Sequence, residues 1–558
     1  MRSRIILVCL VFLLVALIEF AANRAHRTPS APAASGAIGA KSPALVAAHY
    51  FGRHGPKNYL NGYRREFVAA DFHQLRADGF NAVVLLVPWI ELQPNISTCC
   101  RFDERAFARL RYLIDEAGSA GLKVVLRVGY GWSFADGDVG VRQRRLLNDP
   151  TTRTVYFRFL EHVQQELNSK PQIVLSFLTW EDLWLRRIDE SARPDYRAFL
   201  GSRGLPLREA AEPLPQPQRS GAERFNAYWD WLVITRILIP ASKILPNLGY
   251  EARIDRDPVP AVDAQGKPTV RWLGHETSYR LPGASTAILY WAPFWGAQNH
   301  GEQVDAAFAL SHLERLLEEV AAQAPEQSLF IDQLNIVDNT PGMETNATLA
   351  PDQIDSFLDA VPCALRRHRG IGYGIWSDRD YRESPLYNPS FSYGLEGWTF
   401  TSGTIGKASP VERLRSSDAQ LRMYPGDVLA QMVPSIRGWD ASLRDRICVI
   451  ADAAAPSTLH VDIGAAQTLL HFFKRGRQEV CAPIAFPAAS NELVLRMRLG
   501  SGNLALRDIY LFDHVQRGGL YDDEGRPQPM LPALRRANRA MVDPASHVCS
   551  TNLMQSHK

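Results

Sequence analysis

The chain has 558 residues, of which 46% are hydrophobic and 22% charged, and its formal net charge is +3. A chain of this length and composition can bury a large core, and we expect two folded domains in it. The small net charge and the scattered basic residues argue against a nucleic-acid partner. Twelve Trp and eighteen Tyr are more than core packing usually requires, and such rings serve as stacking platforms in sugar-binding clefts.

The first residues carry a targeting signal. Two arginines precede an apolar run from Ile5 to Ala22, which is long enough to cross a bilayer as a helix with its N-terminus inside. We therefore expect residues 1–22 to be a signal anchor in a bacterial inner membrane, with the remaining domains in the periplasm. The alternative is a cleaved signal peptide and secretion to the periplasm, although the best cleavage site, Ala31–Ala33, contains a proline and lies far from the run.

Seven cysteines are too few for a disulfide scaffold of this size. They form no C-x-x-C motif and no His cluster accompanies them, so we expect neither a structural metal site nor a cofactor. Export would permit a bridge between Cys448 and Cys481, but spacing alone does not show it.

Strand and helix patterns alternate after a flexible linker over residues 23–43, which is rich in Ala, Pro, Ser and Gly. Short runs rich in Val, Ile and Leu suit parallel strands that are covered on both faces. Apolar stripes at helical spacing fill most of the gaps between them. Eight such strands predict an α/β fold, a (β/α)₈ TIM barrel over residues 44–387. The expected strands are Ala44–Tyr50, Asn81–Val87, Lys123–Val128, Gln172–Leu178, Leu248–Ile254, Thr286–Tyr290, Ser328–Leu334 and Gly370–Trp376.

Two stretches interrupt the expected barrel. Leu185–Gly221 is a long insertion after the fourth strand, on the side where barrel active sites are built, and Asp255–Ser285 shows no clear helix. Near Asn388 the pattern changes to short alternating strands, which predict an antiparallel β-sandwich over residues 388–515. Residues 516–558 are polar, basic and poorly patterned, and we expect a loosely ordered tail.

The segment IVLSFLTWEDLW ends the fourth strand and places Glu181 directly after Trp180. Together with GFNAVVLLVPWIELQP at residues 79–94 and GYGIWSDRDY at residues 372–381, it resembles the clan A, cellulase-like (β/α)₈ glycoside hydrolases. The resemblance implies that Glu181 is the catalytic acid/base and that Trp376 floors the sugar site. The segment NPSFSYGLEGW, which begins at Asn388, resembles the opening of carbohydrate-binding modules.

Glycosidic cleavage requires one carboxylic acid to protonate the leaving oxygen and a second carboxylate to attack or to activate water. Flanking Trp180 and Trp184 would raise the pKa of Glu181 and keep it protonated near neutrality. The alternative is that Glu181 and Asp182 only begin a helix, where its dipole stabilises them.

The second carboxylate is harder to assign. The resemblance implies a nucleophilic Glu at the end of the seventh strand, where this chain has Gln333, and an amide cannot act as that nucleophile. Asp332 is adjacent, but strand alternation sends it to the opposite face from Gln333 unless the strand contains a bulge. Glu251 lies in the fifth strand, beside the fourth. We therefore consider Asp332 first and Glu251 second.

Further candidates for sugar contact lie at the expected strand ends, where active-site residues of such barrels gather. They are Tyr50, Trp89, Arg127, Tyr130, Trp180, Tyr290, Gln333, Asn335 and Trp376. Each ring taken singly is more often packing than ligand contact, and Trp398 of the sandwich is equally a core candidate.

The chain contains no Gly-rich phosphate loop, G-x-S-x-G elbow or H-E-x-x-H helix, which argues against nucleotide, serine esterase and zinc protease chemistry. The expected function is a glycoside hydrolase that acts on an envelope or exported polysaccharide. The alternative is a catalytically silent glycan-binding barrel that serves in polysaccharide secretion or assembly. Both imply a polysaccharide or oligosaccharide partner.

Overall fold

The structure is a computed structural model. It describes residues 44–52, 55–56, 59–62, 65–94, 96, 100–130, 141–179, 183, 188–208, 212–216, 222–246, 248–251, 257–262, 268–273, 284–293, 303–336, 347–382, 384, 386–391, 394–395, 397–403, 411–413, 419–434, 445–484, 492–512, 515–522, 524–546 and 549. The expected anchor and linker lie outside these residues. Among the helices of the described part, none is both long and apolar enough to span a bilayer.

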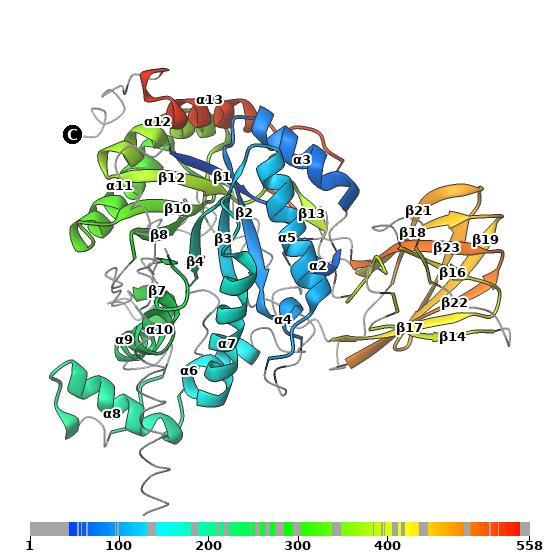
Figure 1. Ribbon diagram of the computed structural model, residues 1–558, viewed down its shortest axis with the longest axis horizontal. Helices are drawn as coiled ribbons and strands as arrows, with labels where there is room; N and C mark the ends of the chain where they lie inside the picture. The colour runs from blue at the N-terminus through cyan, green and yellow to red at the C-terminus, as the bar shows by residue number, and fades with distance from the viewer. Residues whose placement is uncertain are drawn as a thin grey trace, which may run out of the picture. The chain divides into compact units, whose positions relative to one another are not determined.

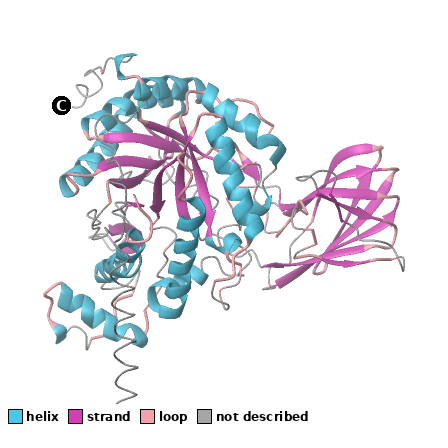
Figure 2. Cartoon of the chain, viewed as in Figure 1, coloured by secondary structure: helices cyan, strands magenta, loops and turns pink. Residues whose placement is uncertain are grey.

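Eight parallel strands close into a barrel in the order β1-β12-β10-β8-β5-β4-β3-β2. Figure 2 shows strands of this barrel in magenta with helices in cyan around them. Each barrel strand coincides with one of the eight strands expected from the sequence, so the TIM-barrel prediction is confirmed. The strands are β1 (Leu45–His49), β2 (Ala82–Pro88), β3 (Lys123–Tyr130), β4 (Ile173–Leu178), β5 (Leu248–Glu251), β8 (Thr286–Trp291), β10 (Ser328–Leu334) and β12 (Gly370–Ile375).

Helices surround these strands (Figure 1). Three of the long ones begin at an aspartate whose side chain accepts from backbone N–H groups of the first turn, namely Asp103, Asp149 and Asp305; such caps fix where a helix starts. The helices are α2 (Tyr59–Gly62), α3 (Arg65–Ala77), α4 (Trp89–Leu92), α5 (Glu104–Ser119), α6 (Val141–Asn148), α7 (Pro150–Leu167), α8 (Arg193–Ser202), α9 (Ala222–Val233), a π-helical turn (Ile234–Leu238), α10 (Ile239–Ser242), α11 (Ala306–Gln323), α12 (Ile354–Arg367) and α13 (Leu531–Val542).

The strands separate two apolar layers. Val46, Val83 and Ile331 belong to the large cluster that includes the helix faces, whereas alternate residues such as Ala47 and Phe330 form a second, smaller cluster. Because successive strand residues point to opposite faces, this second cluster fills the inside of the barrel. Its other fully buried members are Leu45, Ala82, Val84, Val125, Leu175, Phe177 and Ile288.

The stretch between β5 and β8 contains an antiparallel hairpin, β6 (Asp257–Val262) and β7 (Pro268–Leu273), where the sequence shows no helix. The insertion after β4 contains a short 3₁₀ turn (Glu190–Ala192) and α8. Short pairs β9 (Gln303–Val304) with β11 (Thr348–Leu349) and β13 (Tyr381–Arg382) with β24 (Val515–Gln516) complete this part of the chain.

Two five-stranded antiparallel sheets form the expected sandwich, in the orders β14-β17-β22-β19-β20 and β15-β16-β23-β18-β21. Trp398 is buried in the core between them, and its Nε1–H donates to the backbone oxygen of Asn388; it is a core residue. The strands are β14 (Thr399–Thr401), β15 (Val411–Arg413), β16 (Ala419–Met423), β17 (Val428–Pro434), β18 (Asp445–Ala453), β19 (Ser457–Ile463), β20 (Ala466–Phe472), β21 (Gly476–Pro483), β22 (Glu492–Ser501) and β23 (Leu504–Phe512).

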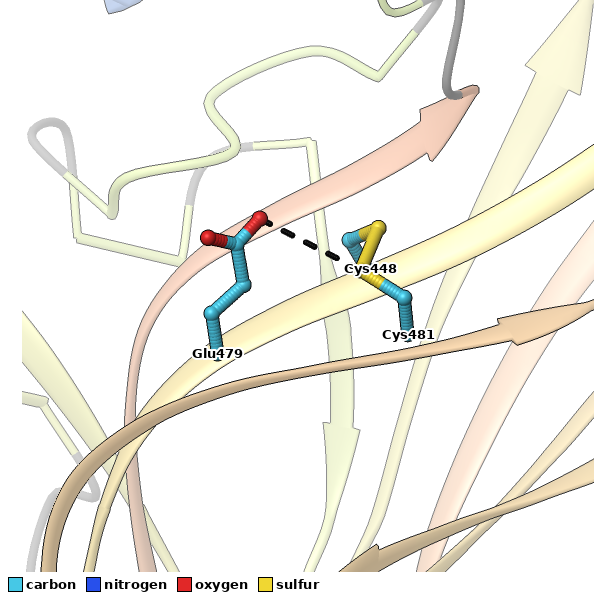
Figure 3. A group of neighbouring side chains, drawn as sticks. All are labelled: Cys448, Glu479 and Cys481. Carbon is cyan, nitrogen blue, oxygen red and sulfur yellow. Dashed lines mark hydrogen bonds between the residues drawn. A yellow bond between two sulfur atoms is a disulfide. The ribbon is translucent and has the colours of Figure 1, made fainter. Parts of the chain in front are cut away.

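Cys448 and Cys481 stand opposite each other on β18 and β21 and form a disulfide. The bridge that the sequence left open is therefore present in the structure. Figure 3 shows the carboxylate of Glu479 beside it, 4.0 Å from the sulfur of Cys481. These three side chains are close enough to resemble a metal-binding group, but a disulfide has no thiolate to offer a metal ion.

The chain after the sandwich returns to the barrel. Helix α13 lies beside α12 (Figure 1) and also contacts β1. Its apolar face, with Leu531, Leu534 and Met541, is buried in the same cluster as the other barrel helices. A (β/α)₈ barrel needs a helix after its last strand, and α13 fills that role. The prediction of a loosely ordered tail is wrong for Leu531–Val542, and the sandwich is an insertion between strand β12 and the helix that follows it.

Polar contacts fix α13 in place. The buried carboxylate of Asp78, after α3, accepts from the guanidinium of Arg535 at 2.6 Å and from the hydroxyl of Tyr521. Asn538 accepts at 2.7 Å from the hydroxyl of Tyr373, which is on β12. A disulfide between Cys363 of α12 and Cys549 joins the end of the chain to the neighbouring helix.

Candidate active site

Polar side chains replace apolar ones at the carboxyl ends of the barrel strands. Arg127, Glu251 and Asp332 each stand two residues beyond a residue that faces the inside of the barrel, so alternation turns them inward as well. All three are at most 3% exposed. The same rule turns His49 of β1 and the half-buried Tyr290 of β8 inward.

A bulge in β10 brings Asp332 and Gln333 to the same face. In the ladder with β8, Ile331 pairs with Leu289 and Gln333 pairs with the next residue, Tyr290, so that Asp332 has no counterpart. Ile331 and Leu334 both pack in the layer between strands and helices, which leaves the two residues between them on the inner side. The condition under which Asp332 could join the site is therefore met.

Arg127 provides a buried positive charge in this region. Its guanidinium donates to the hydroxyl of Thr179, directly after β4, at 3.0 Å. Its charge helps to lower the pKa of nearby His49, and a guanidinium can also donate to the hydroxyls of a sugar.

His49 is neutral. Its Nε2 lies 2.7 Å from the backbone oxygen of Asp332, and because a carbonyl only accepts, Nε2 carries the proton. Burial lowers the pKa of His49 to about 3, and the nearby charge of Arg127 acts in the same direction. His49 therefore does not serve as an acid at neutral pH.

Trp376 follows β12 at the same end of the barrel and is half-buried. Its ring packs 5.0 Å from that of His49 and 4.5 Å from that of Phe51, and its Nε1–H donates to the hydroxyl of Tyr381. The peptide bond from Trp376 to Ser377 is cis. A ring held on one side and partly open on the other suits a stacking surface for a sugar.

Two of the predicted sugar-contacting rings lie elsewhere. Tyr50 faces the helix layer, where its hydroxyl donates to Asp71 of α3 at 3.2 Å. Trp89 is fully buried in α4, packs against Tyr156 of α7, and donates to Gln93. Both follow a strand in the sequence, but neither is in the interior of the barrel.

Of the remaining predicted site residues, the structure describes the side chain of Asn335 only. Asn335 follows β10, is half-buried, and its N–H donates to the backbone oxygen of Trp291. Glu181, Trp180 and the side chain of Tyr130 lie outside the described residues.

A buried charge network next to Trp376 was missed by the sequence reasoning. Arg379 pairs with Asp71 at 2.7 Å and with Asp378 at 3.4 Å. Burial raises the pKa of Asp378 to about 7, against the opposing effect of Arg379. The signal was present in the GYGIWSDRDY segment, because a charged run directly after a barrel strand must pair if it is buried. The network fixes the loop that carries Trp376.

Comparison with family models and with curated proteins finds no match. Among solved structures, the chain is similar to the exo-β-1,4-mannosidase Op5Man5 from Opitutaceae bacterium strain TAV5, at 16% identity and a TM-score of 0.38, over 62% of this chain and 53% of that one. It is also similar to a GH5_18 protein from Streptomyces cattleya in complex with GlcNAc, at 18% identity and a TM-score of 0.37, over 61% of this chain and 72% of that one. A third similar structure is the endo-1,4-β-mannanase from Rhizomucor miehei, at 10% identity and a TM-score of 0.37, over 61% of this chain and 87% of that one. All three are glycoside hydrolases. This chain spans about half the length of the first.

Proposed function

We propose that the protein is a glycoside hydrolase that acts on an envelope or exported polysaccharide. The observation that carries the proposal is the pair of buried carboxylates, Asp332 and Glu251, which face the inside of the barrel at the carboxyl ends of their strands. Active sites of (β/α)₈ barrels lie at this end. Acids held in a buried, charge-bearing setting are candidates for catalysis rather than for packing.

The proposed roles follow from the chemistry of glycosidic cleavage. Glu181, three residues beyond the end of β4 in the sequence, protonates the leaving oxygen, and Asp332 attacks the anomeric carbon or activates the water that does. Glu251 is the alternative to Asp332, since β5 is the direct neighbour of β4. Trp376 and Tyr290 supply ring surfaces, and Arg127 and Gln333 supply N–H groups for sugar hydroxyls.

The test is hydrolysis by residues 44–558 against a panel of exported polysaccharides and β-linked oligosaccharides, read as released reducing ends. Asp332→Asn should abolish turnover while binding of the same glycan persists, because the amide keeps the shape of the side chain but removes the base. Asp352→Asn, at an exposed acid in the turn before α12, is the matched control and should behave as wild type. Full activity in Asp332→Asn together with loss in Glu251→Gln would transfer the role to Glu251.

A second candidate function is a catalytically silent barrel that binds glycan during polysaccharide secretion or assembly. Gln333 favours it, because the resemblance implies a carboxylate where this chain has an amide. The same panel separates the two functions. Glycan binding by the wild-type protein with no released reducing ends, even over long incubation, would identify the silent barrel.

We also propose that residues 1–22 hold the protein in a bacterial inner membrane with its domains in the periplasm. The disulfides Cys363–Cys549 and Cys448–Cys481 support an oxidising compartment, because such bridges are rare in the reducing cytosol. Cell fractionation and N-terminal sequencing test the anchor. A mature protein that begins near Ala34 in the soluble fraction would show cleavage instead.

A further inference from the structure

The bulge in β10 is supported by two residues that have no part in the proposed mechanism, His49 and Gly374. The Nε2–H of His49 donates to the backbone oxygen of Asp332, the extra residue of the bulge. Strands β1 and β10 are not neighbours, because β12 lies between them. The hydrogen bond therefore passes over β12 on the inner side of the barrel wall.

Gly374 is the residue of β12 next to this bond. A Cβ atom at position 374 would stand 2.4 Å from the backbone oxygen of Asp332. This distance is shorter than a non-bonded contact between a carbon and an oxygen atom. A side chain at position 374 would push this carbonyl away from its present place. Because Gly374 has no side chain, the carbonyl of Asp332 can occupy this space.

The imidazole of His49 packs against the rings of Phe51 and Trp376, but packing alone does not require its second nitrogen. Within the described part of the chain, no group bonds Nδ1, which is buried. A buried acceptor without a partner costs about 1–3 kcal/mol, and an apolar side chain of similar size would avoid that cost. A residue that destabilises the fold in this way is expected to contribute to function.

We propose that His49 is a positioning residue. Its Nε2–H fixes the carbonyl of Asp332, and thereby the bulge that keeps Gln333 on the same inner face as Asp332. Gly374 is required for the same arrangement. The catalytic consequence rests on the proposed function, whereas the arrangement itself is testable without turnover.

The kinetic test compares four variants. His49→Leu removes the N–H and should lower kcat roughly 10²-fold with little change in KM, the effect of a misplaced reacting group. His49→Gln retains an N–H at similar reach and should recover most of the loss. Gly374→Ala should resemble His49→Leu. Val46→Ala, on the helix-facing side of the same strand, is the control that lowers Tm without touching the bulge and should keep kcat. A kcat in His49→Leu equal to that of Val46→Ala would overturn the proposal.

The arrangement is tested independently by NMR of the wild-type protein with ¹⁵N-labelled histidine. His49 should show one tautomer, protonated at Nε2, with no titration between about pH 5 and pH 8. Amide resonances of Asp332 and Gln333 should shift in His49→Leu and stay in place in Val46→Ala. Protonation at Nδ1, titration in this range, or unmoved amides would overturn the proposal. If the wild-type protein turns over no glycan, the proposed function fails, and these resonances still decide whether His49 positions the bulge.

Discussion

At the scale of single residues, one extra residue in β10 places Asp332 and Gln333 on the same face of the strand. The sequence predicted that Asp332, Glu251 and Arg127 stand at strand ends, because periodicity locates a strand. It did not reveal the bulge, since a bulge is a property of the ladder between two strands. For the same reason it could not tell that Tyr50 faces the helix layer, where alternation from β1 places it. Trp89 belongs to a helical turn directly after β2, which a strand-end rule does not anticipate.

Glu181 is the residue whose replacement tests the acid most directly. Glu181→Gln preserves size and polarity, so the fold and glycan binding should persist, but proton donation is lost. Turnover of substrates with poor leaving groups should fall by roughly 10²–10⁴-fold. Activated aryl glycosides need little protonation and should lose less at the bond-breaking step. Equal polysaccharide turnover in the variant and the wild type would exclude Glu181 as the acid.

Asp378 should make stability depend on pH. Its pKa rises from 3.8 to about 7 on folding because of burial, so the folded state keeps a proton that the unfolded chain releases above about pH 4. The stability that this proton provides is fully present below about pH 4 and is lost as the pH rises through about 7. In urea titrations, wild type should therefore lose stability relative to Asp378→Asn between pH 4 and pH 8, whereas an Asp352→Asn control should stay parallel to wild type. A constant difference between wild type and Asp378→Asn would show that Asp378 does not titrate in this range.

At the scale of elements, α13 shows where sequence reasoning stopped short. Leu531, Leu534 and Met541 follow a helical spacing that was readable. The polar, basic composition of the surrounding residues obscured it. The arginines that made the tail look solvated are ones that bind the barrel: Arg535 pairs with buried Asp78, and Arg536 with Asp355 of α12.

The insertion gives a test of domain boundaries. A fragment of residues 44–387 lacks α13, so it exposes the apolar surface that Leu531, Leu534 and Met541 cover, and Asp78 loses its partner Arg535. We therefore expect this fragment to aggregate or unfold. Arg382 and Val515 are antiparallel partners, so residues 383–514 can be replaced by an Asn-Gly turn. This excised variant keeps α13 and should unfold cooperatively near the Tm of the full chain.

The same excised variant tests the sandwich, which we propose contributes affinity for polymer rather than chemistry. Hydrolysis of soluble oligosaccharides should persist without it, and binding to the insoluble polysaccharide should weaken. Equal binding and turnover on polymer by the excised variant and the full chain would make the sandwich a structural element only.

At the scale of the whole molecule, the Cys363–Cys549 bridge ties the end of the chain to the barrel over a separation of 186 residues. Cysteine spacing could not predict it, because α13 brings Cys549 beside α12 only once the barrel has closed. A bridge over so long a loop stabilises mainly by restricting the unfolded chain, by roughly 2–5 kcal/mol. Replacing both cysteines with serine should lower the free energy of unfolding by an amount in that range, measured by urea titration without reductant.

The control is the same replacement at Cys448 and Cys481, whose separation is 33 residues. The loop-entropy account gives this shorter bridge the smaller effect. A reductant should lower the Tm of the wild type further than the Cys363/Cys549 replacement does, because it also opens the Cys448–Cys481 bridge. It should lower the Tm of the Cys363/Cys549 double variant only by the contribution of the bridges that remain in it. A Tm of the wild type that is the same in oxidising and reducing buffer would show that closure of the barrel does not depend on the bridge. The disulfides would then no longer support the proposal that the protein is exported to an oxidising compartment.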